Sequence, residues 1–182
     1  MKICIYYFSG AGNTECIAKI IEQISQNKGN SVYRKRITKK FLEKIEQDYD
    51  ILEIGFPVYF RHAPLMVLNF INRQVGNNRK FFTFCTKGLY SGNASREIHN
   101  LAQKKSFRVA GNLEFYMPGS DGLTLMAKKK SLTEKIFKCI HSKNIRSQIE
   151  NFIISIKRLE NIEEVKSKWY IPFDNGIIKP LE

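Results

Sequence analysis

The stretch that decides the fold lies at the start of the chain: Ile3-Cys4-Ile5-Tyr6-Tyr7-Phe8-Ser9-Gly10-Ala11-Gly12-Asn13-Thr14. Its first half is an unbroken apolar run of strand length, and residues 15–21 bring apolar residues back at helical spacing. Between them lies a short turn of small residues. The first amides of a helix have no partner inside the helix, and glycines allow the backbone to approach an anion closely. We therefore predict a strand–turn–helix unit that binds phosphate.

Length and composition predict one globular domain. The chain has 182 residues, of which 43% are hydrophobic, and this is enough for a substantial core. We expect no secretion signal, because Lys2 is followed by only six apolar residues before the polar turn. We also expect no membrane-spanning helix, because no apolar stretch approaches the roughly 18 residues that a span requires. Cys4, Cys16, Cys85 and Cys139 are far apart and form no CxxC pair. This spacing indicates reduced thiols in a cytoplasmic protein and argues against a zinc site or an iron–sulfur cluster.

The chain is strongly basic. Thirty Lys and Arg oppose seventeen Asp and Glu, which gives a net charge of +13. This charge fits an ordinary basic surface, an acidic protein partner, an anionic ligand, or docking on nucleic acid or lipid. No nucleic-acid-binding motif accompanies the basic runs, of which Arg34-Lys35-Arg36 is one. We therefore expect no nucleic-acid partner.

Further along the chain, strand patterns alternate with helix patterns. We predict strands over 31–37 (polar enough for a sheet edge), 50–56, 80–85 and within 107–117. We predict helices from near Asn13 to before Gly29, over 41–47, from Pro64, over 94–105, and along Ile145, Ile149, Phe152, Ile153 and Ile156. This alternation predicts an α/β fold, a doubly wound and mostly parallel sheet with helices on both faces. We place this domain at residues 1–160, with residues 161–182 as a C-terminal tail packed on it.

In such sheets, ligands bind at the carboxyl ends of the strands. The loops that follow the first, third and fourth predicted strands are residues 9–14, 57–63 and 86–92. All three fall at carboxyl ends, so we expect them to converge on one crevice.

These motifs resemble the flavodoxin family. The phosphate turn, Gly55-Phe56-Pro57-Val58-Tyr59, residues 86–92 and Met117-Pro118-Gly119 are most similar to the flavodoxin-like domain of bacterial flavodoxin–ferredoxin fusion proteins. The resemblance covers about residues 1–160. It implies a five-stranded sheet of order 2-1-3-4-5 with FMN at its switch point, an arrangement for which flavodoxin itself is the standard example.

The resemblance also implies roles for individual residues. The FMN phosphate would be held by Ser9, Gly10, Gly12, Asn13 and Thr14, with help from the Ala11 amide. One side of the isoalloxazine would be walled by Pro57, Val58, Tyr59 and Phe60. Its other edge would be lined by Thr86, Lys87, Gly88, Leu89, Tyr90, Ser91 and Gly92. Tyr59 or Tyr90 could stack on the ring or be ordinary surface tyrosines, and Lys87 could stabilise reduced flavin or be a solvated cation.

Three departures from the family pattern leave the function open. No CxxCxxC cluster motif is present, the chain is basic where electron-carrier flavodoxins are acidic, and the loop after the third strand has no glycine. Without glycine, a backbone flip to positive φ there is costlier. We expect an FMN-binding electron-transfer protein with an acidic, ferredoxin-like partner.

Two alternatives remain at this point. One is an FMN-dependent oxidoreductase acting on a small molecule such as a quinone or porphyrinogen, with residues 118–130 shaping its pocket. The other is a flavin-free interaction module. The three histidines suggest no catalytic role: His62 looks like an exposed loop residue, and neither His99 nor His141 has an evident partner.

Overall fold

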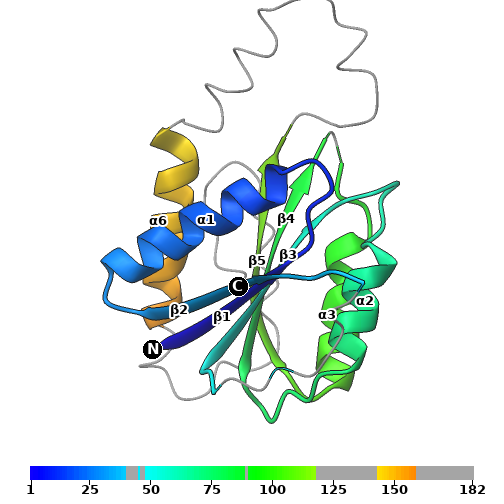
Figure 1. Cartoon of the computed structure of the whole chain (residues 1–182), viewed down its shortest axis with the longest axis horizontal. Helices are drawn as coiled ribbons and strands as arrows, with labels where there is room; N and C mark the ends of the chain where they lie inside the picture. The colour runs from blue at the N-terminus through cyan, green and yellow to red at the C-terminus, as the bar shows by residue number, and fades with distance from the viewer. Residues whose placement is uncertain (40–44, 46–47, 89, 118–142, 159–182) are drawn as a thin grey trace, which may run out of the picture.

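A five-stranded parallel sheet forms the centre of the molecule (Figure 1). The computed structural model describes residues 1–39, 45, 48–88, 90–117 and 143–158. The strands are β1 (Lys2–Tyr7), β2 (Ser31–Arg36), β3 (Ile51–Pro57), β4 (Lys80–Lys87) and β5 (Arg108–Tyr116). Their order is β2-β1-β3-β4-β5, and every neighbouring pair is parallel. The predicted fold class and strand order are therefore confirmed.

Helices cover both faces of the sheet, as Figure 1 shows. The helices are α1 (Asn13–Asn27), α2 (Leu65–Asn72), α3 (Ala94–Lys104) and α6 (Lys143–Arg158). One core layer joins the sheet to α1 and α6, with Ile17, Ile149 and Phe152 among its buried residues. The other layer joins the sheet to α2 and α3, through residues such as Phe70 and Ile98. Within the described ranges, no helix is long and apolar enough to cross a bilayer.

The strand burial explains this arrangement. Residues 3–7 of β1 and 51–56 of β3 are buried throughout, because helices cover both of their faces. In contrast, β2 contains no fully buried residue and lies at the edge of the sheet, as its polarity predicts. Long apolar runs therefore occupy the centre, where burial of each large side chain contributes about 1.5–3 kcal/mol.

Local sequence signals mark the end of α1 and the start of α2. Gly29 follows α1 at φ +80°, the left-handed conformation that commonly ends a helix. Pro64 is the residue before α2 and has extended geometry, so the prediction that it is the first helical residue was wrong by one position. The predicted helix over 41–47 and the predicted tail 161–182 lie outside the described residues, apart from Ile45.

One polar side chain is buried in the middle of β3. Glu53 is 1% exposed, and its neighbours in register are Ile5 and Phe82. Neither carboxyl oxygen has a hydrogen-bond partner among the described residues. Burial raises the pKa of Glu53 to about 8. Glu53 is therefore protonated in the folded protein at neutral pH.

This buried carboxyl makes stability depend on pH. In the unfolded chain a glutamate ionises near pH 4.3, whereas folded Glu53 keeps its proton up to about pH 8. Its contribution to stability is thus complete below about pH 4.3 and is lost as the pH rises toward 8, by up to about 1.4 kcal/mol for each pH unit. We expect Glu53→Gln to remove this loss. The difference in unfolding free energy between variant and wild type, measured with urea from pH 5 to 8, should grow with pH; a constant difference would contradict this assignment.

Candidate functional site

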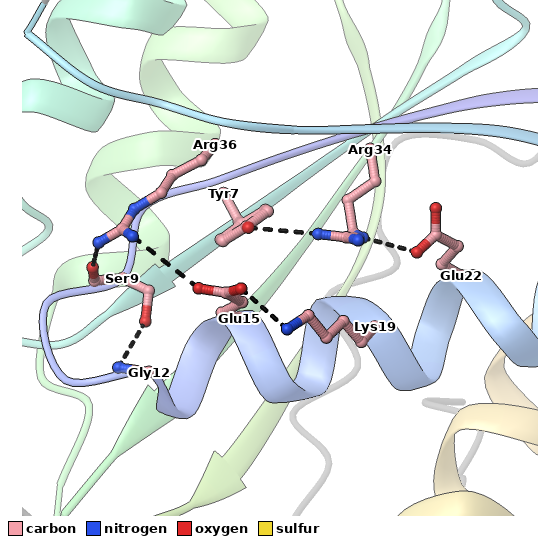
Figure 2. Close-up of polar contacts among 8 residues, drawn as sticks. All are labelled: Tyr7, Ser9, Gly12, Glu15, Lys19, Glu22, Arg34 and Arg36. Carbon is pink, nitrogen blue, oxygen red and sulfur yellow. Dashed lines mark hydrogen bonds and ion pairs between the residues drawn. The ribbon is translucent and has the colours of Figure 1, made fainter.

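The turn between β1 and α1 exposes its backbone above a buried serine. Gly10, Ala11 and Gly12 are exposed, whereas Ser9 is 1% exposed. The amide of Gly12 donates a hydrogen bond to Ser9 Oγ at 3.0 Å (Figure 2). Gly12 has φ +93°, which favours glycine, and α1 begins at the next residue, Asn13. The turn therefore presents glycine backbone at the positive end of a helix, as an anion site requires.

A buried hydroxyl pair joins this turn to the end of β4. Thr14 and Thr86 are 1% and 4% exposed, and their Oγ1 atoms lie 2.8 Å apart. Thr86 also lies beside the end of β3, because its carbonyl accepts a hydrogen bond from the Val58 amide at 2.9 Å. The first predicted loop and the beginning of the third are thus in direct contact.

The loop after β3 is a tight turn formed without glycine. Tyr59 and His62 exchange two backbone hydrogen bonds of 3.0 and 2.9 Å. Between them, Phe60 and Arg61 have φ values of 47° and 71°. The lack of glycine led us to expect positive φ to be costly here, yet two non-glycine residues adopt it. Each such residue costs about 1–3 kcal/mol, and the conformation persists only where contacts with the surroundings offset that cost.

Contacts on two sides hold this turn. Tyr59 lies against the phosphate turn, because a Cβ added at Gly10 would be 2.4 Å from the Tyr59 hydroxyl. On the other side, the Asn93 amide donates to the Arg61 carbonyl at 3.0 Å. A Cβ added at Gly92 would be 2.3 Å from the Arg61 Cβ. The turn after β3 therefore bridges the other two loops, and all three meet at one edge of the sheet.

The ring-side residues predicted from the sequence differ in their exposure. Pro57 and Val58 are half-buried, while Tyr59 is 39% and Phe60 98% exposed. In the β4 loop, Gly88 is exposed and Ser91 and Gly92 are half-buried. Tyr90 is 62% exposed, and the guanidinium of Arg61 lies 5.3 Å from its ring centre. Leu89 lies outside the described residues, as do residues 118–130.

Lys87 is not a free cation. Its ammonium donates to Glu114 Oε2 at 2.5 Å and lies 4.6 Å from the Tyr116 ring centre. Although burial lowers the pKa of Lys87, the hydrogen bond and charge of Glu114 raise it above its ordinary value. The Ser91 hydroxyl donates to the same carboxylate oxygen at 3.1 Å. Glu114 therefore ties together two residues of the predicted flavin loop.

Two of the three histidines, His62 and His99, have side-chain partners. The Nδ1 of His62 lies 2.5 Å from Glu97 Oε1, and Glu97 Oε2 accepts from the Ala63 amide at 3.1 Å. His99, for which the sequence indicates no partner, is 7% exposed and has its Nε2 2.8 Å from Thr83 Oγ1. Burial lowers the pKa of His99 to about 4, so the ring is neutral at pH 7. His141 lies outside the described residues.

The sequence interpretation missed two residues that contact the loops. Glu114 could have been noticed as a lone acid between Leu113 and Phe115 in an apolar strand. Arg36 belongs to the basic run Arg34-Lys35-Arg36, which composition alone places on the surface with no specific partner. Strand alternation places Arg34 and Arg36 on the same face of β2, toward α1, where Arg34 Nε pairs with Glu22 Oε2 at 2.6 Å (Figure 2).

Gly92 provides a test of the contact between loops. Gly92→Ala combines φ +58° with Cβ contacts of 2.3–2.8 Å to Arg61, two of them to backbone atoms. We expect a loss of unfolding free energy of about 2 kcal/mol or more from overpacking and backbone strain. Gly88→Ala is the matched control, because the same Cβ at Gly88 would meet nothing within 4 Å. Equal thermal stability of the two variants would show that the loops do not touch in this way.

Comparison with known proteins supports the fold. No protein-family model matches the chain, and no curated protein sequence matches it. Solved flavodoxin structures do match, among them oxidised flavodoxin 2 from Bacillus cereus, at 16% identity with a TM-score of 0.61, covering 87% of this chain and 99% of that one. Fusobacterium nucleatum flavodoxin bound to flavin mononucleotide matches at 14% identity with a TM-score of 0.56, covering 87% and 98%. A flavodoxin from the domain Archaea matches at 18% identity with a TM-score of 0.52, covering 82% and 99%. At these identities the comparison shows that the chain has the flavodoxin-like fold.

Proposed function

We propose that this protein is a cytoplasmic FMN-binding electron-transfer protein. The observation that carries the proposal is the meeting of three loops at the carboxyl ends of β1, β3 and β4. In this fold, that edge is where ligands bind. The similarity to a flavodoxin structure bound to flavin mononucleotide supports the choice of ligand. Cys4, Cys16 and Cys85 are free thiols, in keeping with a reducing compartment.

The turn at residues 9–14 suits a phosphate. Its glycines leave the backbone uncovered, and α1 directs its first amides toward the turn. Ser9 Oγ and Thr14 Oγ1 lie beneath this backbone, each within hydrogen-bonding distance of another group of the loops. In our proposal Ser9, Gly10, Ala11, Gly12, Asn13 and Thr14 hold the FMN phosphate.

The ring would lie between the loops after β3 and β4. Tyr59, Phe60 and Tyr90 supply exposed aromatic surface on both sides of that space. Bound FMN would supply the redox chemistry, while the protein supplies binding and electrostatic tuning. The Lys87–Glu114 ion pair, which joins the loop after β4 to β5, would contribute to such tuning.

The charges at this edge favour an acidic redox partner. Arg61 and Arg96 are exposed, and the Arg36 side chain is 49% exposed. Three acidic residues among those described lie near this edge, and each has a carboxylate oxygen within 4 Å of a side-chain nitrogen: Glu15 of Lys19 and Arg36, Glu97 of His62, and Glu114 of Lys87. The excess positive charge would attract an acidic protein surface and increase its association rate. A small ferredoxin-like protein is such a partner.

Titration with flavin tests the proposal. The purified protein should quench FMN fluorescence with one site per chain, and it should bind riboflavin more weakly because riboflavin lacks the phosphate. Ser9→Ala should weaken FMN binding by about tenfold, since it removes a buried hydroxyl of the phosphate turn. Ser25→Ala is the control: Ser25 is also buried, but it lies near the far end of α1. Absence of FMN binding by the wild-type protein would overturn the proposal.

The Lys87–Glu114 pair predicts that two variants shift the flavin reduction potential in opposite directions. Glu114→Gln keeps an acceptor for Ser91 but removes the negative charge, which leaves the Lys87 ammonium unbalanced. We expect a more positive flavin reduction potential, because a nearby cation favours the reduced, anionic form. Lys87→Gln leaves Glu114 unbalanced and should shift the potential in the negative direction. Potentials measured by dye equilibration should move oppositely; shifts of the same sign would exclude this electrostatic role.

A further inference from the structure

Arg36 contacts the phosphate turn from outside the strand–turn–helix unit. It is the last residue of edge strand β2, in register with Tyr7 at the end of β1. The next residue continues the pairing, because the Ile37 amide donates to the Tyr7 carbonyl at 2.7 Å. Arg36 is therefore held beside the point where β1 ends and the turn begins (Figure 2).

The Arg36 guanidinium reaches both ends of the turn. Its Nη2 donates to the Ser9 carbonyl at 2.5 Å, and its Nη1 lies 3.9 Å from Glu15 Oε2. Ser9 precedes the exposed glycines, whereas Glu15 belongs to the first turn of α1. One side chain thus links the two ends of a glycine-containing loop. Only arginine offers several donors in a rigid fork that can serve two acceptors at once.

The contact with Ser9 also orients a peptide group. The Ser9 carbonyl and the Gly10 amide belong to the same peptide bond, and the described residues contain no cis peptide. In a trans peptide the C=O and N–H point in opposite directions. While Arg36 holds the carbonyl, the Gly10 N–H points away from the guanidinium. If this peptide rotated, the Ser9 carbonyl would take the place of the Gly10 N–H donor on the other side of the turn.

We propose that Arg36 is a positioning residue that holds the phosphate turn in its binding conformation by bridging Ser9 and Glu15. This inference rests on the proposed function, because it assigns to Arg36 the preorganisation of the FMN phosphate site. Glycine loses more conformational freedom on ordering than any other residue, so a turn that is already held loses less freedom when the ligand binds.

The rival explanation is charge alone. Glu15 lies close to the phosphate turn and would repel a phosphate, so any cation that neutralises it would help binding. Lys19 provides the comparison, because its Nζ lies 3.0 Å from Glu15 Oε1 but makes no hydrogen bond to the turn among the described residues (Figure 2). Lys19→Ala and Arg36→Ala each remove one cation from Glu15, and only Arg36→Ala also releases Ser9.

The experiment measures the dissociation constants of FMN and riboflavin for the wild type, Arg36→Ala, Arg36→Lys and Lys19→Ala. We expect Arg36→Ala to weaken FMN binding by about tenfold and Lys19→Ala by much less, with riboflavin binding nearly unchanged in both. Arg36→Lys keeps the charge but cannot bridge two acceptors in the same way, so its FMN affinity should fall close to that of Arg36→Ala. Thermal unfolding without ligand checks that each variant is folded.

Three results would overturn the inference. Wild-type FMN affinity in Arg36→Lys would show that a positive charge is enough for tight FMN binding. Equal losses of FMN affinity in Arg36→Ala and Lys19→Ala would show that the contact with Ser9 does not contribute to FMN binding. A loss of riboflavin affinity as large as that of FMN would also exclude a role specific to the phosphate turn. Failure of the wild-type protein to bind FMN is a separate outcome, which removes the proposed function itself.

Discussion

The structure depends on the burial of β1 and β3 in the middle of a parallel sheet. Both strands are covered on both faces, so their backbone groups must pair with neighbouring strands, and their side chains must be apolar. Parallel pairing in turn requires crossover helices, and these form the two outer layers. Because all five strands point the same way, every polar loop that follows a strand leaves at one edge. The candidate site is a consequence of this constraint.

At that edge, specific polar contacts hold the loops in place, as apolar packing holds the sheet and helices in the interior. The hydroxyls of Thr14 and Thr86 join the phosphate turn to the loop after β4, while Glu114 holds Lys87 and Ser91 within that same loop. These groups are buried or half-buried, where a hydrogen bond left unmade costs about 1–3 kcal/mol. The loops are therefore held relative to one another before any ligand arrives, which lowers the entropy lost on binding.

The turn after β3 is also held by contacts with its neighbours, and its backbone is strained. Phe60 and Arg61 adopt a backbone conformation that bulky residues rarely take. The bridge between Tyr59 and His62, the Asn93 hydrogen bond and the lack of a side chain at Gly92 together keep them there. A glycine at position 60 or 61 would relieve the strain and leave these backbone hydrogen bonds in place.

The sequence by itself determined the layers, the strand–turn–helix unit at residues 3–21 and the positions of the three loops, because apolar runs and small-residue turns are local signals. The strand order was expected only from the family resemblance. It did not reveal that Phe60 and Arg61 take positive φ, that Lys87 is paired with Glu114, or that Arg36 holds Ser9. It also left His99 without its partner Thr83. Each of these depends on two segments that only the folded sheet brings together: β2 beside the end of β1, β5 beside the end of β4, and α3 over β4. Tertiary structure decided them because a hydrogen bond or ion pair needs a partner at about 3 Å, and no pattern within one segment specifies that partner.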